Sequence, residues 1–339
     1  MVSIGLDVHA RSSVLHALDS RGNTVAKERV RGTIDKILPH LRRIKDKFRE
    51  PLGICYEASC GYGHVFETLS RVADRVVPAH PGKLRLIFAG RRKNDHQDAR
   101  HLAMLLKLDA VPTVYVPDVE VRDWRMLITH RESVLRRRVG VKNRIRALLR
   151  TYGIQAPKGL WSQKGRAWLA SVPFETGTTR LRRDLLLTDL ELDTLQLKRV
   201  EKELDHIGRR HPGVQLLRTI PGGGIRTAEA VLAWIDRPER FARNKSIGSY
   251  FGMVPCQDQS ADRNRLGHIT KQGPAVVRRL LTEASWQSLR HSVRMKAYFE
   301  KVMRGDPDRR KIALVAVGHC LLRAMLSMLQ TGEVWRRET

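Results

Sequence analysis

Short apolar runs and longer amphipathic stretches alternate along the first hundred residues. Apolar runs bounded by turn residues predict β-strands, and apolar positions three or four residues apart predict helices. The expected strands cover residues 3–8, 13–18, 24–26, 52–57 and 75–78, and the expected helices cover residues 34–48, 64–72 and 95–108. Three strands followed by alternating helices and strands predict an α/β domain with a mixed sheet, an order that RNase H-like sheets share.

The rest of the chain is expected to be largely helical. Residues 119–152 predict one long helix, and residues 157–179, which contain several Gly, Pro and Thr, predict a connector. Leucines and isoleucine between residues 181 and 207 fit either a short coiled coil, and hence a dimerisation element, or an intramolecular amphipathic helix, because their heptad is irregular. Helical spacing resumes near residue 212, apart from a polar, basic and strand-poor stretch at residues 255–273. We therefore expect three domains, at residues 1–155, 156–211 and 212–339.

The charge balance predicts a polyanionic partner. The 339 residues include 63 Lys and Arg against 35 Asp and Glu, a formal net charge of +28. Nucleic acid is the first candidate and an anionic membrane surface the second. The most apolar stretch, residues 312–322, is expected to be too short to span a membrane, and we expect no signal peptide at the start of the chain. The four cysteines lack the paired spacing of a zinc site and suit a reducing cytoplasm, where we expect the protein to act.

Seven basic residues and no acid lie between residues 136 and 150. A solvated helix face is the usual explanation of such a run. Like charges on one helix repel one another, so a bound phosphate backbone explains this run better. The predicted nucleic-acid contacts of the run are Arg136, Arg137, Arg138, Lys142, Arg144 and Arg146.

A Pro-Gly-Gly-Gly turn at residues 221–224 separates two helical segments, an arrangement that resembles a helix-hairpin-helix. Glycines there expose backbone N–H groups at a helix N-terminus, so Gly222 and Gly224 are candidate phosphate contacts. The alternative is a turn that only joins two helices.

Four carboxylates stand at or near the ends of predicted elements: Asp7, Glu57, Asp95 and Asp98. Acids are poor strand residues, and buried charged carboxylates need compensation. A divalent metal would supply that compensation, with Mg²⁺ as the first candidate and Mn²⁺ as the alternative. The competing interpretation is that Asp7 and Glu57 cap strand ends while Asp95 is a helix N-cap with Asp98 at position N3. Three flanking histidines are expected to support the metal ligands or to contact DNA: His9, His96 and His101.

A serine in the polar stretch could act as a nucleophile. Ser260 lies among Arg263, Arg265 and Lys271, and a serine hydroxyl can attack phosphorus where cations hold the phosphate. Composition by itself does not select this serine, because loop serines are common and three others compete: Ser246, Ser249 and Ser285.

Several short motifs together resemble one family of proteins. Gly-Leu-Asp-Val at residues 5–8, Tyr-Glu-Ala-Ser at 56–59 and Lys-Asn-Asp-His-Gln-Asp-Ala at 93–99 resemble the DEDD set of a group of insertion-sequence transposases. Ile-Pro-Gly-Gly-Gly at 220–224, Phe-Gly-Met-Val-Pro at 251–255, and Ile-Thr-Lys-Gln-Gly at 269–273 followed by Arg-Arg-Leu-Leu at 278–281 resemble its second domain. This group is the DEDD transposases with an additional catalytic serine, the bridge-RNA-guided recombinases.

The resemblance implies a RuvC-like domain, a coiled-coil connector and a helical transposase domain. The four carboxylates would hold Mg²⁺ against a scissile phosphate of double-stranded DNA, in a donor or a target. Ser260 would attack that phosphate and leave a covalent serine–DNA ester, although Ala261 follows it where many members have glycine. A structured noncoding RNA would guide the reaction, and domains of different subunits would meet in a dimer or tetramer.

Two other functions compete with a serine recombinase. A metal-dependent nuclease, such as a Holliday-junction resolvase, would use water as its nucleophile and would need only about the first 150 residues. A nucleic-acid-binding scaffold would account for the charge but not for acids inside apolar strands.

Overall fold

The computed structural model describes residues 1–88, 94–260 and 263–336. Its contacts divide the chain into two compact units, Met1–Val119 and Glu120–Thr339. The first unit is shorter than the expected domain of residues 1–155. The reason is that the long helix after Val119 places Trp124 and Ile128 in the hydrophobic core of the second unit.

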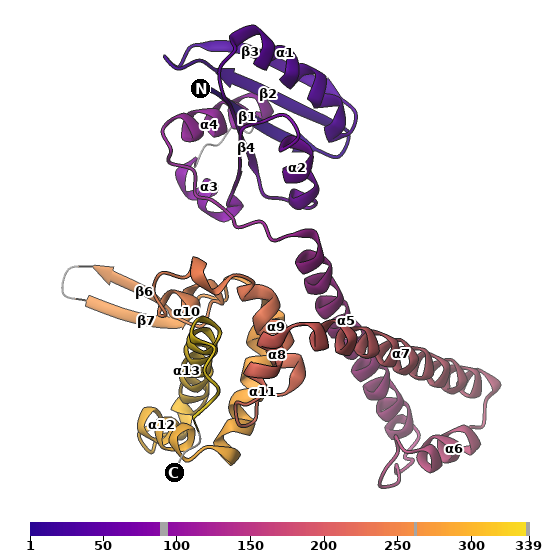
Figure 1. Ribbon diagram of the computed structural model, residues 1–339. Coiled ribbons are helices and arrows are strands. Elements are labelled where there is room, and N and C mark those ends of the chain that lie inside the picture. Colours follow the sequence, from indigo (N-terminus) through magenta and orange to yellow (C-terminus); the bar gives the residue numbers. More distant parts are fainter. Residues whose placement is uncertain (89–93, 261–262, 337–339) are drawn as a thin grey trace. The chain divides into compact units, whose positions relative to one another are not determined.

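The first unit is built on a five-stranded mixed sheet in the order β3-β2-β1-β4-β5, which confirms the predicted α/β domain (Figure 1). Strand β1 pairs antiparallel with β2, and β2 with β3, whereas β1, β4 and β5 run parallel. The strands are β1 (Val2–His9), β2 (Ser12–Leu18), β3 (Thr24–Arg31), β4 (Leu52–Glu57) and β5 (Arg75–Ala79). The third strand is longer than the sequence predicted because its exposed, charged residues obscure the alternation.

Helices cover both faces of this sheet. Alternate strand residues such as Ile4 and Leu6 are buried in a core with α1 (Leu38–Phe48) and α2 (Tyr62–Leu69). The other face carries α4 (Asp95–Lys107), which contacts β1, β2 and β4 and shares a smaller core with Cys55. The remaining elements of the unit are the 3-10 helix η1 (Ile34–Ile37) and α3 (Pro81–Ile87).

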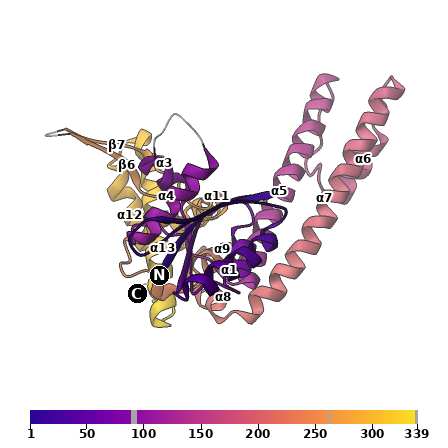
Figure 2. The same cartoon turned by 90° about the horizontal axis from the view of Figure 1, so that it is seen from above.

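The second unit begins with two long helices that lie side by side, α5 (Val119–Thr151) and α7 (Gly177–Arg210) (Figures 1 and 2). The short helix α6 (Gln163–Ser171) connects them and helps to bury a separate apolar cluster that includes Ile145 and Leu190. One face of α7 thus packs within the chain, as the intramolecular alternative predicted.

A helical bundle completes the second unit. Its elements are α8 (Pro212–Leu217), α9 (Ile225–Ile235), η2 (Pro238–Arg240), α10 (Ser246–Tyr250), α11 (Ala275–His291), α12 (Val293–Met303), η3 (Pro307–Arg309) and α13 (Arg310–Thr331). Helix α13 contacts α8 to α12 and supplies much of their common core. Residues Pro307–Thr331 are long and apolar enough to cross a membrane, so the expectation of too short a stretch was wrong. Half of the most apolar window, 50 %, is nevertheless buried inside the structure, because the helix is apolar on the faces that its neighbours cover.

Residues 255–269 form a β-hairpin, so the expectation of a strand-poor stretch was wrong. Strands β6 (Pro255–Ser260) and β7 (Arg263–Ile269) pair antiparallel with each other and form a separate two-stranded sheet (Figure 1). The hairpin lacks the apolar alternation that normally identifies a strand, because its described side chains are mostly exposed. Backbone pairing therefore defines it.

Candidate metal centre and nucleic-acid surfaces

Two candidate acids lie side by side where parallel strands end. Leu6 of β1 is in register with Tyr56 of β4, so the next residues, Asp7 and Glu57, occupy neighbouring positions. Side chains in register on parallel strands point to the same face of a sheet. This face is the one that α4 covers, because Gly5, two residues before Asp7, lies under that helix.

Gly5 lets the backbone of α4 approach the sheet unusually closely. A Cβ atom at Gly5 would lie 1.8 Å from the carbonyl oxygen of Ala99 and 2.6 Å from the backbone nitrogen of Ala103. The first turn of the same helix carries Asp95 and Asp98, which share one face at a spacing of three residues. The glycine therefore brings the acids of the helix toward the acid of the strand.

The N-cap of α4 is Asn94, whose side chain accepts a hydrogen bond from the backbone nitrogen of His96 at 3.0 Å. Asp95 is the first residue inside the helix, so its interpretation as an N-cap was wrong. Because another residue already satisfies the helix terminus, capping does not explain the Asp95 carboxylate.

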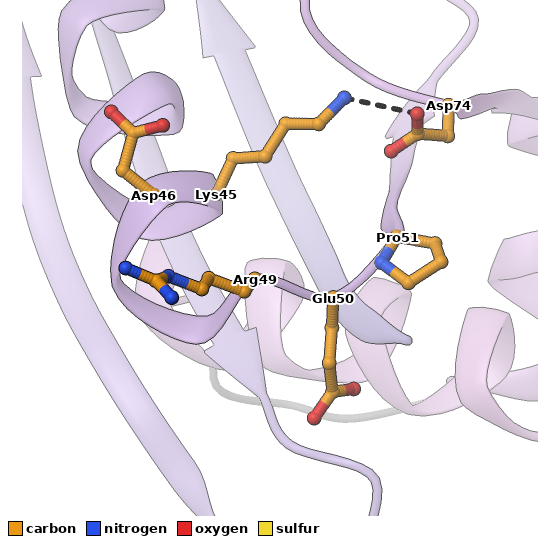
Figure 3. A pocket seen from close by; sticks show the side chains of 6 residues that line it. All are labelled: Lys45, Asp46, Arg49, Glu50, Pro51 and Asp74. Atoms are coloured by element: carbon orange, nitrogen blue, oxygen red, sulfur yellow. Dashed lines mark hydrogen bonds and ion pairs between the residues drawn. The ribbon is translucent and has the colours of Figure 1, made fainter.

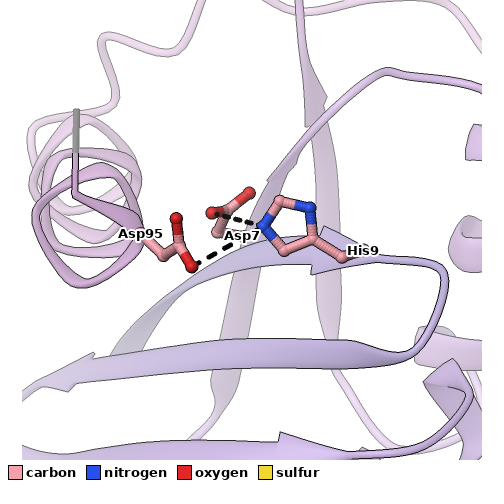
Figure 4. A group of neighbouring side chains, drawn as sticks. All are labelled: Asp7, His9 and Asp95. Carbon is pink, nitrogen blue, oxygen red and sulfur yellow. Dashed lines mark hydrogen bonds and ion pairs between the residues drawn. The ribbon is translucent and has the colours of Figure 1, made fainter.

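Three side chains converge at this point (Figure 4). The Nε2 atom of His9 lies 3.2 Å from Oδ2 of Asp7 and 3.8 Å from Oδ2 of Asp95. One ligand atom from each of the three residues lies within 4.8 Å of the others. Glu57 and Asp98 are not part of this compact group within the described chain, so the structure joins two of the four predicted acids directly.

Sequence reasoning gave His9 only a supporting role and missed Arg29 altogether. His9 follows Asp7 by two residues on one strand, and that spacing places both side chains on one face. Arg29 reaches the site from β3 and donates a hydrogen bond of 2.7 Å to Asp95. No local signal predicts this contact, because 66 residues separate the partners.

The electrostatics of the group favour an added cation. Burial raises the pKa of Asp7; His9 opposes the rise, and the negative charges of Asp95 and Asp98 add to it. The hydrogen bond from Arg29 lowers the pKa of Asp95. Burial is the largest cause of the raised pKa of Asp7, so a bound cation would favour the charged form of this carboxylate. A divalent metal fits this donor set, since carboxylate oxygens are the hard ligands that Mg²⁺ favours.

The candidate nucleophile stands at the end of a hairpin strand. Ser260 is the last residue of β6, and its backbone pairs with Arg263 of β7. The side chains of these two residues, and the whole of Ala261, lie outside what the structure describes. Arg265 is exposed on β7, and the exposed Lys271 lies beyond the end of that strand.

Family-motif glycines hold the base of this hairpin. A Cβ at Gly252 would lie 2.2 Å from the carbonyl oxygen of Gln272, and one at Gly273 would lie 2.2 Å from that of Tyr250. Arg278 of α11 lies at the same place. One of its nitrogens donates hydrogen bonds of 2.6 to 3.1 Å to the backbone carbonyl oxygens of Phe251, Gln272 and Gly273. These residues fix the direction in which the hairpin leaves the bundle.

The basic run on α5 is less uniform than the sequence predicted. Arg137 forms an ion pair of 3.1 Å with Asp193 of α7, so the expectation that all seven charges are uncompensated was wrong. The partner is 56 residues away, beyond the reach of any local pattern. Arg136, Arg144 and Arg146 are exposed, and Lys142 and Arg146 lie over the ring of Trp161.

The two candidate glycines of the turn between α8 and α9 differ in their surroundings. Gly222 has a φ of +80°, and a Cβ there would lie 2.6 Å from the backbone nitrogen of Ser288 in α11. Its conformation and packing therefore explain the glycine without a ligand. Gly224 is exposed, with nothing near its Cβ position, and it precedes the first residue of α9.

Figure 3 shows a hollow on the first unit that none of the four candidate metal ligands lines. It is lined by Lys45, Asp46, Arg49, Glu50, Pro51 and Asp74. Asp74 accepts hydrogen bonds from the backbone nitrogen of Leu52 at 2.8 Å and from Lys45 at 2.9 Å, and these bonds lower its pKa. Because Leu52 begins β4 and Glu57 ends it, the hollow lies at the opposite end of the strand, where its charges tie a loop to the sheet.

Comparisons with known proteins agree with the motifs. The family model described as "Transposase IS116/IS110/IS902 family" matches residues 214–300, and the model of the DEDD domain of IS110 transposases, described as "Transposase", matches residues 4–154. The chain is 27 % identical to a transposase for insertion sequence element IS1111A of Coxiella burnetii, over 82 % of this chain and 78 % of that protein. It is 26 % identical to a transposase for insertion sequence element IS1328 of Yersinia enterocolitica, over 83 % of this chain and 82 % of the relative.

A third relative spans nearly the whole chain. It is a putative transposase, y4pF/y4sB, of Sinorhizobium fredii, 25 % identical over 99 % of this chain and 86 % of its own length. The two family models match separate parts of the sequence, one in each half, and the same kind of relative aligns across both. The chain therefore belongs to the IS116/IS110/IS902 family of insertion-sequence transposases, enzymes that cleave and rejoin DNA.

Proposed function

We propose that this transposase is a site-specific recombinase whose first unit is an RNase H-like, RuvC-like domain with a divalent metal at its acidic edge. The observation that carries the proposal is the convergence of Asp7 and Asp95, from a strand and a helix far apart in sequence, within 4.8 Å. Glu57, beside Asp7 in register, and Asp98, one helical turn after Asp95, would complete the ligand set. The strand order supports the fold assignment.

Bound Mg²⁺, or Mn²⁺ in its place, would polarise the scissile phosphate and stabilise the oxygen that leaves. The chain itself supplies the positions of the oxygens. Strand pairing fixes Asp7. Asp95 is held by the hydrogen bond from Arg29 and by the close packing of α4 against Gly5 of β1. Such preorganisation matters because a group placed by packing costs little further ordering when substrate binds.

Ser260 is the proposed nucleophile. Its hydroxyl oxygen would form a bond to phosphorus as the bond from phosphorus to the 3′ oxygen breaks, so one end of the cleaved strand carries a serine–phosphate ester and the other end carries a free 3′ hydroxyl. The proton that leaves the serine balances the proton that the departing oxygen takes up. The ester conserves the phosphodiester energy, so the reverse attack by a 3′ hydroxyl can rejoin strands.

The proposed assembly uses the outer face of α7. Leu181, Leu185, Leu192 and Leu195 are each 53 to 58 % exposed, although the opposite face of the same helix is buried. Their spacing of four, seven and three residues is that of a coiled-coil seam. We propose that this leucine seam pairs with a second copy of the chain, as a dimer or within a tetramer, while the inner face packs on α5.

The proposal includes the remaining partners and boundaries. Double-stranded donor and target DNA and a structured guide RNA would bind the basic surfaces in the cytoplasm, with no membrane involved. Residues 1–155 would form the catalytic domain together with its basic helix, and residues 156–211 the connector. Residues 212–339 would form the transposase domain, in which the α8–α9 turn acts as a helix-hairpin-helix and Gly224 contacts a phosphate.

The test is a protein–DNA adduct on a denaturing gel. The full chain, with any RNA that co-purifies, is incubated with Mg²⁺ and labelled DNA carrying the flanks of the element that encodes it. We expect Asp7→Asn to abolish both cleavage and adduct, and Ser260→Ala to abolish the adduct while nucleic-acid binding persists. Ser249→Ala, an exposed serine of α10, is the matched control and should behave as wild type. Cleavage that survives Ser260→Ala would favour a nuclease in which water attacks.

A further inference from the structure

Four cationic side chains gather in the second unit, and two of them lie over one indole ring. Lys142 and Arg146 of α5 lie over the Trp161 ring, with the Lys142 nitrogen 5.0 Å and the Arg146 guanidinium carbon 5.3 Å from its centre. Arg138 and Arg166 are near enough to lower the pKa of Lys142, after the larger effect of burial. We call these five residues the Trp161 cluster.

The cluster is assembled from two parts of the chain. Arg138, Lys142 and Arg146 are four residues apart on α5 and therefore share one face of that helix. Trp161 precedes α6, and Arg166 lies within it. Gly165 lets the start of α6 pack against the preceding turn, since a Cβ there would lie 2.4 Å from the carbonyl oxygen of Gly159. Tertiary packing of α6, and not the α5 sequence alone, therefore brings Arg166 close to the three cations of α5.

Negative charge is missing from the cluster. No ion pair involves Arg138, Lys142, Arg146 or Arg166 among the described residues. The Nε atoms of Arg138 and Arg166 are buried and have no hydrogen-bond partner in that part of the chain. Arg137, next to Arg138, shows the contrast, because its guanidinium is paired with Asp193.

Such an arrangement is costly unless an anion occupies it. Like charges at a spacing of four residues destabilise a helix. A buried donor without an acceptor loses its hydrogen bonds to water and forms none in their place, which destabilises the folded state. A phosphate group offers both remedies, since it carries negative charge and several acceptor oxygens that suit the guanidinium fork.

We propose that the Trp161 cluster binds a backbone phosphate of nucleic acid. The proposal rests on the proposed function, in which this enzyme holds DNA and RNA, and it identifies which cations of the basic run form a built site. Arg138, Lys142, Arg146 and Arg166 bind the phosphate, and Trp161 holds two of them in place by cation–π interactions. Arg137 belongs to the interface between α5 and α7 instead.

The experiment measures binding without Mg²⁺, so that no chemistry is involved. Full-length wild type, Arg166→Gln and Arg166→Lys are titrated with a labelled duplex DNA and, separately, with a labelled RNA hairpin over a range of salt concentrations. Arg182→Gln, an exposed arginine of α7, is the control with the same change of charge. Thermal unfolding of each variant confirms that it is folded.

We expect Arg166→Gln to weaken binding and to reduce the salt slope by about 0.9 for duplex DNA, or about 0.7 for single-stranded regions, for each phosphate that the variant no longer neutralises. Arg166→Lys should keep much of the slope. A weakening confined to one of the two probes identifies DNA or RNA as the source of the phosphate. A folded Arg166→Gln protein with the slope of Arg182→Gln on both probes would overturn the inference. If wild type bound neither probe, the proposed function would fail as well.

Discussion

Replacing Gly5 by alanine should separate helix α4 from strand β1 at the candidate metal site. The new Cβ would lie 1.8 Å from the Ala99 carbonyl oxygen, although Cβ atoms essentially never approach another atom closer than 3.0 Å. This oxygen and the nearby Ala103 nitrogen both belong to the backbone of α4, so a change of side-chain rotamer cannot relieve the clash. The helix must therefore retreat by about 1.2 Å, the difference between those two distances.

Two effects of that movement can be measured. Overpacking of a well-filled core costs about 1–3 kcal/mol, so the free energy of unfolding should fall by that amount in a urea titration. A displacement of about 1 Å between catalytic groups lowers a rate by about 100-fold. Because Asp95 and Asp98 move with α4 while Asp7 stays in β1, the rate of adduct formation should fall by a similar factor.

Gly140→Ala is the matched control. Gly140 lies inside α5 with nothing within 4 Å of its Cβ position, so the same change meets open space. Alanine favours a helix interior by about 1 kcal/mol over glycine, and this variant should be at least as stable as wild type. A Gly5→Ala protein with unchanged stability and unchanged adduct rate would show that the close approach of α4 does not position the acids.

Three further predictions concern the second unit. Burial raises the pKa of Glu229 from 4.5 to about 7, so the folded state keeps a proton that the unfolded state releases, and stability should fall as pH rises through that window. Glu229→Gln should flatten this fall, by at most roughly 3 kcal/mol, in urea titrations at pH 5 and pH 7.5; an equally steep fall would exclude the residue as its source. Arg278→Ala removes three hydrogen bonds at the hairpin base, and we expect adduct formation to drop at least tenfold while duplex binding changes little. Equal reductions in both assays would argue against a positioning role. The double change Leu185→Glu and Leu192→Glu in the leucine seam should convert a dimer to a monomer by light scattering at unchanged helicity, and a dimer that persists would move the interface elsewhere.

Local pattern predicted much of the first unit correctly. Apolar runs placed β1, β2 and β4 close to their observed bounds, because a strand buried on one or both faces shows its burial in its own sequence. The same reasoning placed Asp7 and Glu57 at or near strand ends and Asp95 with Asp98 on one helix face, and the structure shows that the two strands are neighbours. Their roles as metal ligands stay a proposal.

Contacts between distant segments were beyond that reasoning. Arg29 meets Asp95 only because strand pairing sets Arg29 of β3 in register with Val14 of β2 and so with Asp7 of β1. Gly5 matters only because α4 packs on it. The hairpin at residues 255–269 was missed because exposed polar strands carry no periodic signal, and its pairing is between backbones.

The sequence by itself determined the long helices and the buried strands of the first unit, where acids interrupt apolar runs, and that the chain carries a large positive charge. These properties depend on side chains a few residues apart, whose periodicity reports burial directly. Only the tertiary structure decided that Arg137 pairs with Asp193 while the Nε of Arg138 has no partner among the described residues, and that His9 joins Asp7 and Asp95. A charge is compensated by whatever folding brings within a few ångströms of it, and spacing along the chain does not contain that information.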